Sequence, residues 1–138
     1  MNIRWEGLNL EKPIISVQGI RKVYPLGREK VVALRKIDLD IQKGEICCIL
    51  GTSGSGKSTL LNQLAGLEKP TRGHVEICGV NISRLSERQL AVFRQKHIGF
   101  IFQSFNLLPA YTACENVAMP LAFRGFSVRQ RNKAAISL

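Results

Sequence analysis

Eight consecutive residues, 51–58, constrain this chain more than any other feature, because they read Gly-Thr-Ser-Gly-Ser-Gly-Lys-Ser. This spacing satisfies the P-loop pattern G-x-x-x-x-G-K-[ST]. In such a loop, glycines let backbone N–H groups converge on phosphate oxygens, the lysine neutralises the β and γ phosphates, and the last serine ligates magnesium. The alternative, a flexible loop that caps a helix, matches four fixed positions by chance on the order of one time in two hundred. The pattern therefore predicts a phosphate site.

A strand and a helix are expected on either side of this loop. Residues 45–50 are an apolar run suited to a strand that is covered on both faces. Behind the loop, Leu60, Leu61, Leu64 and Leu67 recur at helical spacing. Gly66 can help to end that helix, and Pro70 prevents its continuation.

The remaining segments predict alternating strands and helices. Strands are expected over residues 14–20, 37–41, 74–78 and 98–102, the second of them with polar and apolar residues in alternation. Helices are expected over residues 87–95 and after Thr112 and Ser127. We interpret this as an α/β pattern with an antiparallel portion near the N-terminus.

Composition excludes several classes of protein. The 138 residues are 45% hydrophobic and 22% charged, which is typical of a globular domain, and no apolar run approaches the roughly 20 residues that span a bilayer. The four cysteines lack metal-ligand spacing, and we interpret them as reduced core residues of a cytoplasmic protein: Cys47, Cys48, Cys78 and Cys114. The net charge of +10 suits a nucleic acid, an anionic membrane surface or a nucleotide site.

The flanks of the loop resemble the ATP-binding subunits of ABC transporters. The similar segments, in that family's order, are residues 44–45, 51–61, 69–73 and 98–103. Residues 104–109, 112–117 and 120–121 look most like the branch that drives lipoprotein release and macrolide export. The resemblance implies an α/β P-loop NTPase of the ABC ATPase type with an N-terminal antiparallel β portion, truncated in the helical subdomain. Residues 1–13 would be an extension, and residues 14–138 a partial nucleotide-binding domain whose core reaches to about residue 103.

The same resemblance implies a site for ATP and Mg²⁺. Its residues would be Tyr24, Gly51, Thr52, Ser53, Gly54, Ser55, Gly56, Lys57, Ser58, Thr59 and Gln103. Tyr24 would stack on adenine, since a ring face suits a flat base, although ordinary strand packing is the alternative. Gln103 matches the family's Q-loop glutamine, and Ser58 and Gln103 would be the magnesium ligands.

Several family elements have no counterpart in the sequence. Residues 85–89 faintly echo the signature Leu-Ser-Gly-Gly-Gln, but they lack its two glycines and precede Gln103, so we predict a capping box between Ser86 and Gln89 instead. His74 and His97 are interpreted as structural or surface residues. No aspartate follows Asp40, so no strand ending in Asp-Glu can complete the site, and no catalytic residue is assigned. The chain therefore resembles the N-terminal half of a complete subunit.

The leading functional hypothesis is the ATP-binding subunit of an ABC transporter. The resemblance implies a membrane permease and a second ATP-binding subunit, as a homodimer, for partners, and a peripheral position on the cytoplasmic face of the inner membrane. A nucleotide-binding module without turnover is one alternative. A nucleic-acid-associated ATPase is another, but the basic C-terminal residues lack interleaved aromatic residues and are interpreted as a solvated helix face: Arg124, Arg129, Arg131 and Lys133.

Overall fold

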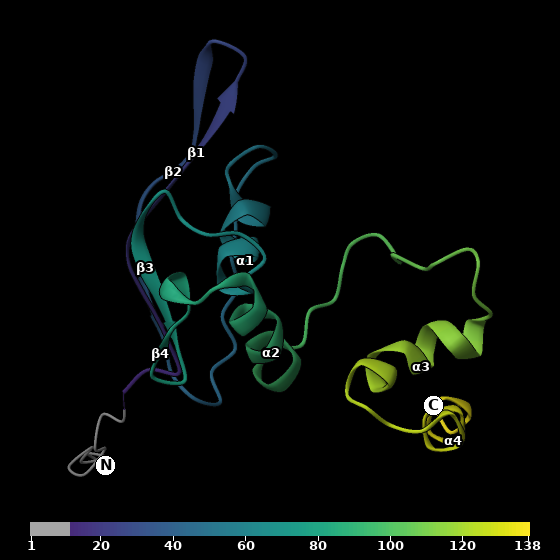
Figure 1. Cartoon of the computed structure of the whole chain (residues 1–138). Coiled ribbons are helices and arrows are strands. Elements are labelled where there is room, and N and C mark those ends of the chain that lie inside the picture. The colour runs from purple at the N-terminus through teal and green to yellow at the C-terminus, as the bar shows by residue number, and fades with distance from the viewer. Residues whose placement is uncertain (1–11) are drawn as a thin grey trace, which may run out of the picture. The chain divides into compact units, whose positions relative to one another are not determined.

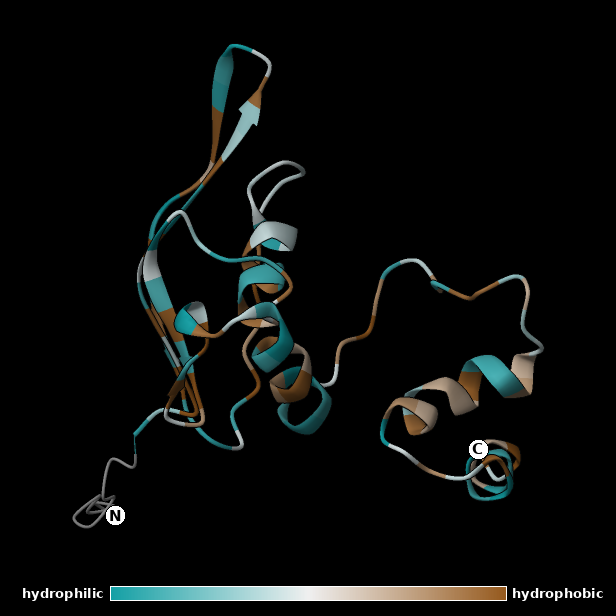
Figure 2. Cartoon of the chain, in the orientation of Figure 1, coloured by the Kyte–Doolittle hydropathy of each residue, from teal (hydrophilic) through white to brown (hydrophobic). Residues whose placement is uncertain are grey.

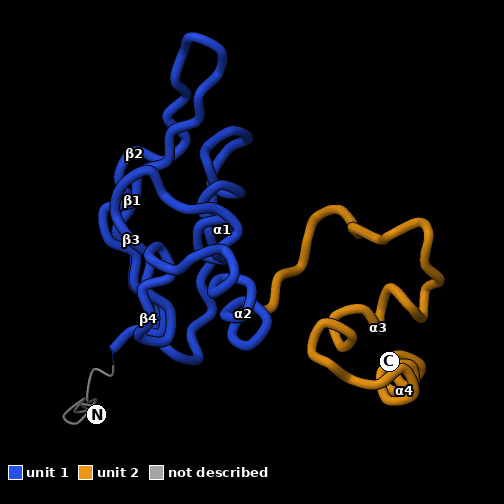
Figure 3. Tube along the Cα trace, in the orientation of Figure 1, with its two compact units in different colours: residues 1–98 blue, residues 99–138 orange. Residues whose placement is uncertain are grey.

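A computed structural model describes residues 12–138 of the chain, which divide into two compact units. The first unit ends at Ile98, and the second runs from Gly99 to Leu138 (Figure 3). Most of the expected N-terminal extension, residues 1–11, lies outside the described residues. Within the described residues, no helix is both long and apolar enough to cross a bilayer.

The first unit contains an antiparallel sheet, as the sequence predicts for this portion (Figure 1). Its described strands are β1 (Ile15–Leu26), β2 (Glu29–Ile41), β3 (Arg72–Ile77) and β4 (Val80–Asn81). They lie in the order β2-β1-β3-β4. The long central strand β1 therefore pairs on both sides, and Val17 lies opposite Leu39 of β2 and Val75 of β3.

Local capping signals fix the starts of three helices. The described helices are α1 (Lys57–Leu64), the 3-10 turn η1 (Ile82–Arg84), α2 (Glu87–His97), α3 (Ala113–Phe123) and α4 (Val128–Ile136). The capping box predicted at Ser86 is present, and Thr112 and Ser127 form the same motif at the starts of α3 and α4. In each box the side chains of the cap and of a residue three positions later bond to each other's backbone N–H. The helices expected at these positions are therefore confirmed.

The core of the first unit lies between the sheet and the helices α1 and α2, which Figure 1 shows on the same side of the sheet. Its buried residues are Val17, Ile20, Leu34, Leu60, Val75, Ile77, Ile82, Leu90 and Phe93. Apolar side chains from strands and helices bury one another there, which is the main favourable contribution to folding. This core sets α1, the helix that follows the glycine loop, against the sheet.

The strands expected over residues 45–50 and 98–102 are not formed, and this prediction was wrong. Ile46 is 92% exposed and Ile101 is 99% exposed, and Figure 2 shows apolar residues along the extended trace that follows α2. A strand buried on both faces forms only where neighbouring strands satisfy its backbone, and no described residue pairs with either segment.

The expectation that the cysteines belong to the core was also wrong. Cys47 and Cys48 are exposed because they lie in the first of these unpaired segments. Cys78 is exposed in the turn after β3, where its φ of 50° is in the left-handed region, and Cys114 is half-buried at the start of α3.

Candidate phosphate-binding site

The glycine loop has the backbone that its sequence requires. Gly54 and Gly56 have φ values of 77° and 92°, which side chains rarely allow. A Cβ on Gly56 would lie 2.7 Å from the Ala33 carbonyl oxygen of β2, and a Cβ on Gly51 would lie 2.6 Å from Ser55 Oγ. The glycines are therefore needed for the close approach of the loop to β2 and to itself.

Lys57 turns its amine back into the loop. Its Nζ donates to the carbonyl oxygens of Gly51 and Thr52 at 2.8 and 2.6 Å, and lies 3.4 Å from Ser55 Oγ. A cation held over the concave side of a glycine loop is well placed to meet an anion there, and phosphate oxygens would exchange with these carbonyls as its partners.

The N-terminus of α1 is open to a ligand. Helix α1 begins at Lys57, and its N-cap residue Gly56 has no side chain to cap it, whereas a serine or threonine caps α2, α3 and α4. The first N–H groups of a helix have no acceptor within it, and the helix dipole adds positive potential at that end. Ser58, exposed in the first turn, adds a hydroxyl oxygen of the kind that Mg²⁺ accepts beside phosphate oxygens and waters. The residues present therefore fit a phosphate group and its metal.

Tyr24 lies on β1 beside the helix that follows the loop. Its hydroxyl donates to Glu68 Oε2 at 2.6 Å. Burial raises the pKa of this hydroxyl, the bond to the carboxylate adds to the shift, and Thr59 in the first turn of α1 opposes it. Tyr24 and Thr59 therefore lie close together, and their shared role at a nucleotide stays a prediction. The sequence did not single out Glu68, because nothing local marks a carboxylate whose partner is 44 residues away.

Gln103 belongs to the second unit, where it is exposed in a stretch without regular structure. Gln103 and the glycine loop belong to different units, and the contact of Gln103 with magnesium stays a prediction.

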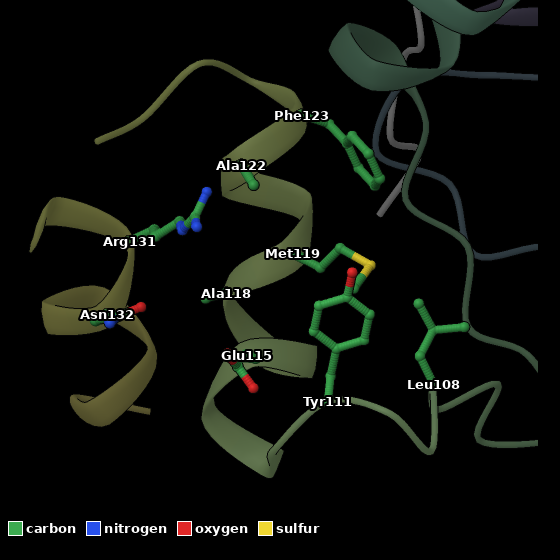
Figure 4. Close-up of a pocket in the computed structure, with 9 residues that line it drawn as sticks. All are labelled: Leu108, Tyr111, Glu115, Ala118, Met119, Ala122, Phe123, Arg131 and Asn132. Carbon is green, nitrogen blue, oxygen red and sulfur yellow. The ribbon is translucent and has the colours of Figure 1, made fainter. Parts of the chain in front are cut away.

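The second unit has a pocket of about 340 Å³ beside α3 (Figure 4). Figure 4 shows Tyr111, Met119 and Phe123 on one side of the helix and Arg131 of α4 on the other. Glu115, at its edge, is already used in the capping box: the backbone N–H of Thr112 and then its hydroxyl lower the pKa of this carboxyl, and Arg131 contributes least. The carboxylate of Glu115 is therefore explained by helix capping.

The glycine loop at the start of α1, set against a sheet, defines a P-loop protein of the α/β class. Comparison with known proteins gives the family. A model of the family described as "ABC transporter" matches residues 34–137, three quarters of the chain, and the chain belongs to that family.

Named relatives agree with this assignment. The chain is 44% identical over 118 residues to the lipoprotein-releasing system ATP-binding protein LolD of Alcanivorax borkumensis. The aligned region covers 86% of this chain and 52% of LolD. It is 43% identical over 129 residues to the macrolide export ATP-binding/permease protein MacB of Agrobacterium fabrum. The aligned region covers 94% of this chain and 20% of MacB.

A solved structure confirms the fold. The ATP-binding cassette MJ0796, in a dimeric post-hydrolysis state bound to ADP and Pi, superposes with a TM-score of 0.84 at 41% identity. The match covers 89% of this chain and 54% of the cassette. The chain thus spans about half the length of such single-cassette relatives.

Proposed function

We propose that this chain supplies the phosphate- and adenine-binding part of the ATP-binding subunit of an ABC transporter. The observation that carries the proposal is the loop at residues 51–58, which combines left-handed glycines, a Lys57 amine bonded to the loop carbonyls and an uncapped helix start. The relatives named as ATP-binding proteins, and the cassette bound to ADP and Pi, support ATP as the ligand.

Each residue of the proposed site has a distinct role. Backbone N–H groups of residues 51–59 hold the phosphates, Lys57 neutralises their charge, and Tyr24 stacks on the base. Ser58 and Gln103 would supply oxygen ligands to magnesium, which when bound neutralises charge on the phosphates. The first unit would be the nucleotide-binding core and the second the start of the helical subdomain.

The proposed partners follow from the family. A membrane permease would couple nucleotide binding and hydrolysis to the export or release of a substrate, from a position of this chain on the cytoplasmic face of the membrane. The names of LolD and MacB support lipoproteins and macrolides as the substrate classes to test first. A second ATP-binding subunit would complete the nucleotide site, and the dimeric state of the MJ0796 cassette supports this.

A nucleotide-binding role without turnover is the second candidate, and the sequence favours it for this chain alone. Hydrolysis needs a positioned group that orients water, and the strand ending in Asp-Glu that would complete the site has no counterpart in the sequence, since no aspartate follows residue 40. Phosphate release by the full chain should then stay near background, and rapid release that depends on Lys57 would exclude this candidate.

Isothermal calorimetry with Mg-ATP tests the proposal. Lys57→Ala should weaken binding about tenfold or more, because charge-assisted bonds to phosphate are lost. Lys36→Ala is the matched control, since this lysine is exposed on β2 and lies outside the loop sequence 51–58. Equal affinity of the wild-type and Lys57→Ala chains would contradict the assignment of the loop. Binding of labelled DNA that persists at physiological salt would favour the nucleic-acid alternative instead.

A further inference from the structure

One carboxylate gathers three side chains at the edge of the proposed site. Glu68 Oε2 accepts the Tyr24 hydroxyl at 2.6 Å and lies 3.0 Å from Lys22 Nζ. Its other oxygen, Oε1, accepts Asn62 Nδ2 at 3.1 Å. The carboxyl group is thus satisfied on both oxygens, and it joins the central strand β1 to the last turn of α1.

The end of α1 holds Glu68 in place. Gly66, with a φ of 62°, reverses the chain, and the N–H groups of Leu67 and Glu68 donate to the Asn62 carbonyl at 2.9 and 3.3 Å. The bond from Leu67 is paired with one from the Gly66 N–H to the Gln63 carbonyl at 3.1 Å. This is the Schellman arrangement that ends many helices. Arg94 of α2 donates to the Gly66 carbonyl at 2.6 Å and ties the turn to the core.

The chain after Glu68 is bonded to β1 as well. Lys22 Nζ donates to the Lys69 carbonyl at 2.8 Å, and Thr71 N–H donates to the Arg21 carbonyl at 2.8 Å. In return, Val23 N–H donates to Thr71 Oγ1 at 3.0 Å. The chain that follows Glu68 is therefore bonded to the residues of β1 that precede Tyr24.

We propose that Glu68 is a positioning residue that fixes the ring of Tyr24 in the plane on which the nucleotide base stacks. The inference rests on the proposed function of Tyr24. A tyrosine anchored only at Cα is free to turn about two side-chain bonds, whereas here the bond to Glu68 holds the outer end of the ring and the Lys22 ammonium lies 5.1 Å from its centroid. A ring already held in place loses less freedom when the base binds.

Calorimetry of the full chain with Mg-ATP and with Mg-tripolyphosphate tests this role. Glu68→Ala and Tyr24→Phe should each weaken ATP about fivefold, and the double variant no further, because both remove one coupled interaction. Tripolyphosphate has no base, so its affinity should stay unchanged. Glu68→Gln keeps an acceptor for the hydroxyl and should recover most of the ATP affinity. The charge-matched control is Glu76→Ala, on β3 away from Tyr24.

The outcomes separate this role from the proposed function. If the wild-type chain binds ATP no better than Lys57→Ala does, both proposals are overturned. If binding depends on Lys57 but Glu68→Ala matches Glu76→Ala, the role of Glu68 alone is overturned. Equal losses for both ligands, or additive losses in the double variant, overturn it in the same way. Should Glu68→Ala fail to fold, Tyr24→Phe decides, and unchanged ATP affinity in that variant refutes the proposal.

Discussion

The sequence predicts a strand both at the start of β1 and over residues 45–50, but only β1 forms one. In β1, Val17 and Ile20 are almost fully buried, and strands pair on both sides. In the segment 45–50, Ile46 and Leu50 are 92% and 90% exposed, and no described residue pairs with its backbone. Apolar character alone therefore does not make a strand, because a strand also needs neighbours that accept its hydrogen bonds and cover its faces.

The source of those neighbours explains the difference. Both partners of β1 lie within the first unit: β2 follows β1 after a short turn, and β3, much later in the sequence, pairs antiparallel with β1 so that Ile77 lies opposite Ile15. A segment covered on both faces needs parallel neighbours, which reach it only through long crossovers. Antiparallel partners for β1 are present within residues 12–98, whereas no described residue forms a parallel strand beside residues 45–50.

Hydrogen exchange should show the largest contrast. Amides of β1 open only with the whole unit, so their exchange should be slowed on the order of a thousandfold or more. Amides of residues 46–50 should exchange almost as fast as in an unstructured peptide. Exchange read by mass spectrometry or NMR measures both in one sample. Comparable protection of the two segments would mean that residues 45–50 pair in solution, and it would contradict the contrast drawn between them.

The same substitution should change the free energy of unfolding far more in β1 than in an unpaired segment. Ile20→Ala removes a fully buried side chain of the core and should lower the free energy of unfolding by about 2–5 kcal/mol. Ile101→Ala makes the same chemical change at a side chain that is 99% exposed and should change it by less than about 0.5 kcal/mol. Chemical denaturation of both variants checks this, and a substantial loss at Ile101 would show that its segment is covered.

Alanine substitutions at two glycines test how closely the backbones of β1 and β3 approach each other. A Cβ on Gly73 would lie 2.5 Å from backbone atoms of Gln18 and Gly19, and the φ of Gly73 is 80°. Gly79 has a similar φ of 76° but open space around it. Gly79→Ala should cost about 1 kcal/mol from backbone strain, and Gly73→Ala about 2–3 kcal/mol because the backbones must also separate. Thermal unfolding measures both, and equal costs would show that the contact at Gly73 yields easily.

These contrasts explain which features the sequence could predict. The capping box at Ser86 and the helix stop at Gly66 depend on residues a few positions apart, and both are present. The glycine loop was predicted for the same reason, since its pattern is local. The strand expected over residues 45–50 was wrong because burial depends on distant partners. Glu68 was missed as a partner of Tyr24 because only the fold brings the end of α1 to β1.

The pH dependence of stability should give the smallest effect, and it concerns the link between β1 and α1. The Tyr24 hydroxyl, followed by Lys22 and Asn62, holds the pKa of Glu68 below its usual value of 4.5, although burial opposes the shift. A carboxyl whose pKa is lower in the folded chain stabilises it above the unfolded pKa, and that contribution is lost as the pH falls through the folded value. Because Glu68 and Lys22 are partly exposed, with 29% and 15% of their side-chain surface accessible, we expect less than about 1 kcal/mol. Unfolding free energies at pH 6 and about pH 3.5 should therefore differ less for Glu68→Gln than for the wild-type chain, and an equal difference in the two proteins would contradict this account.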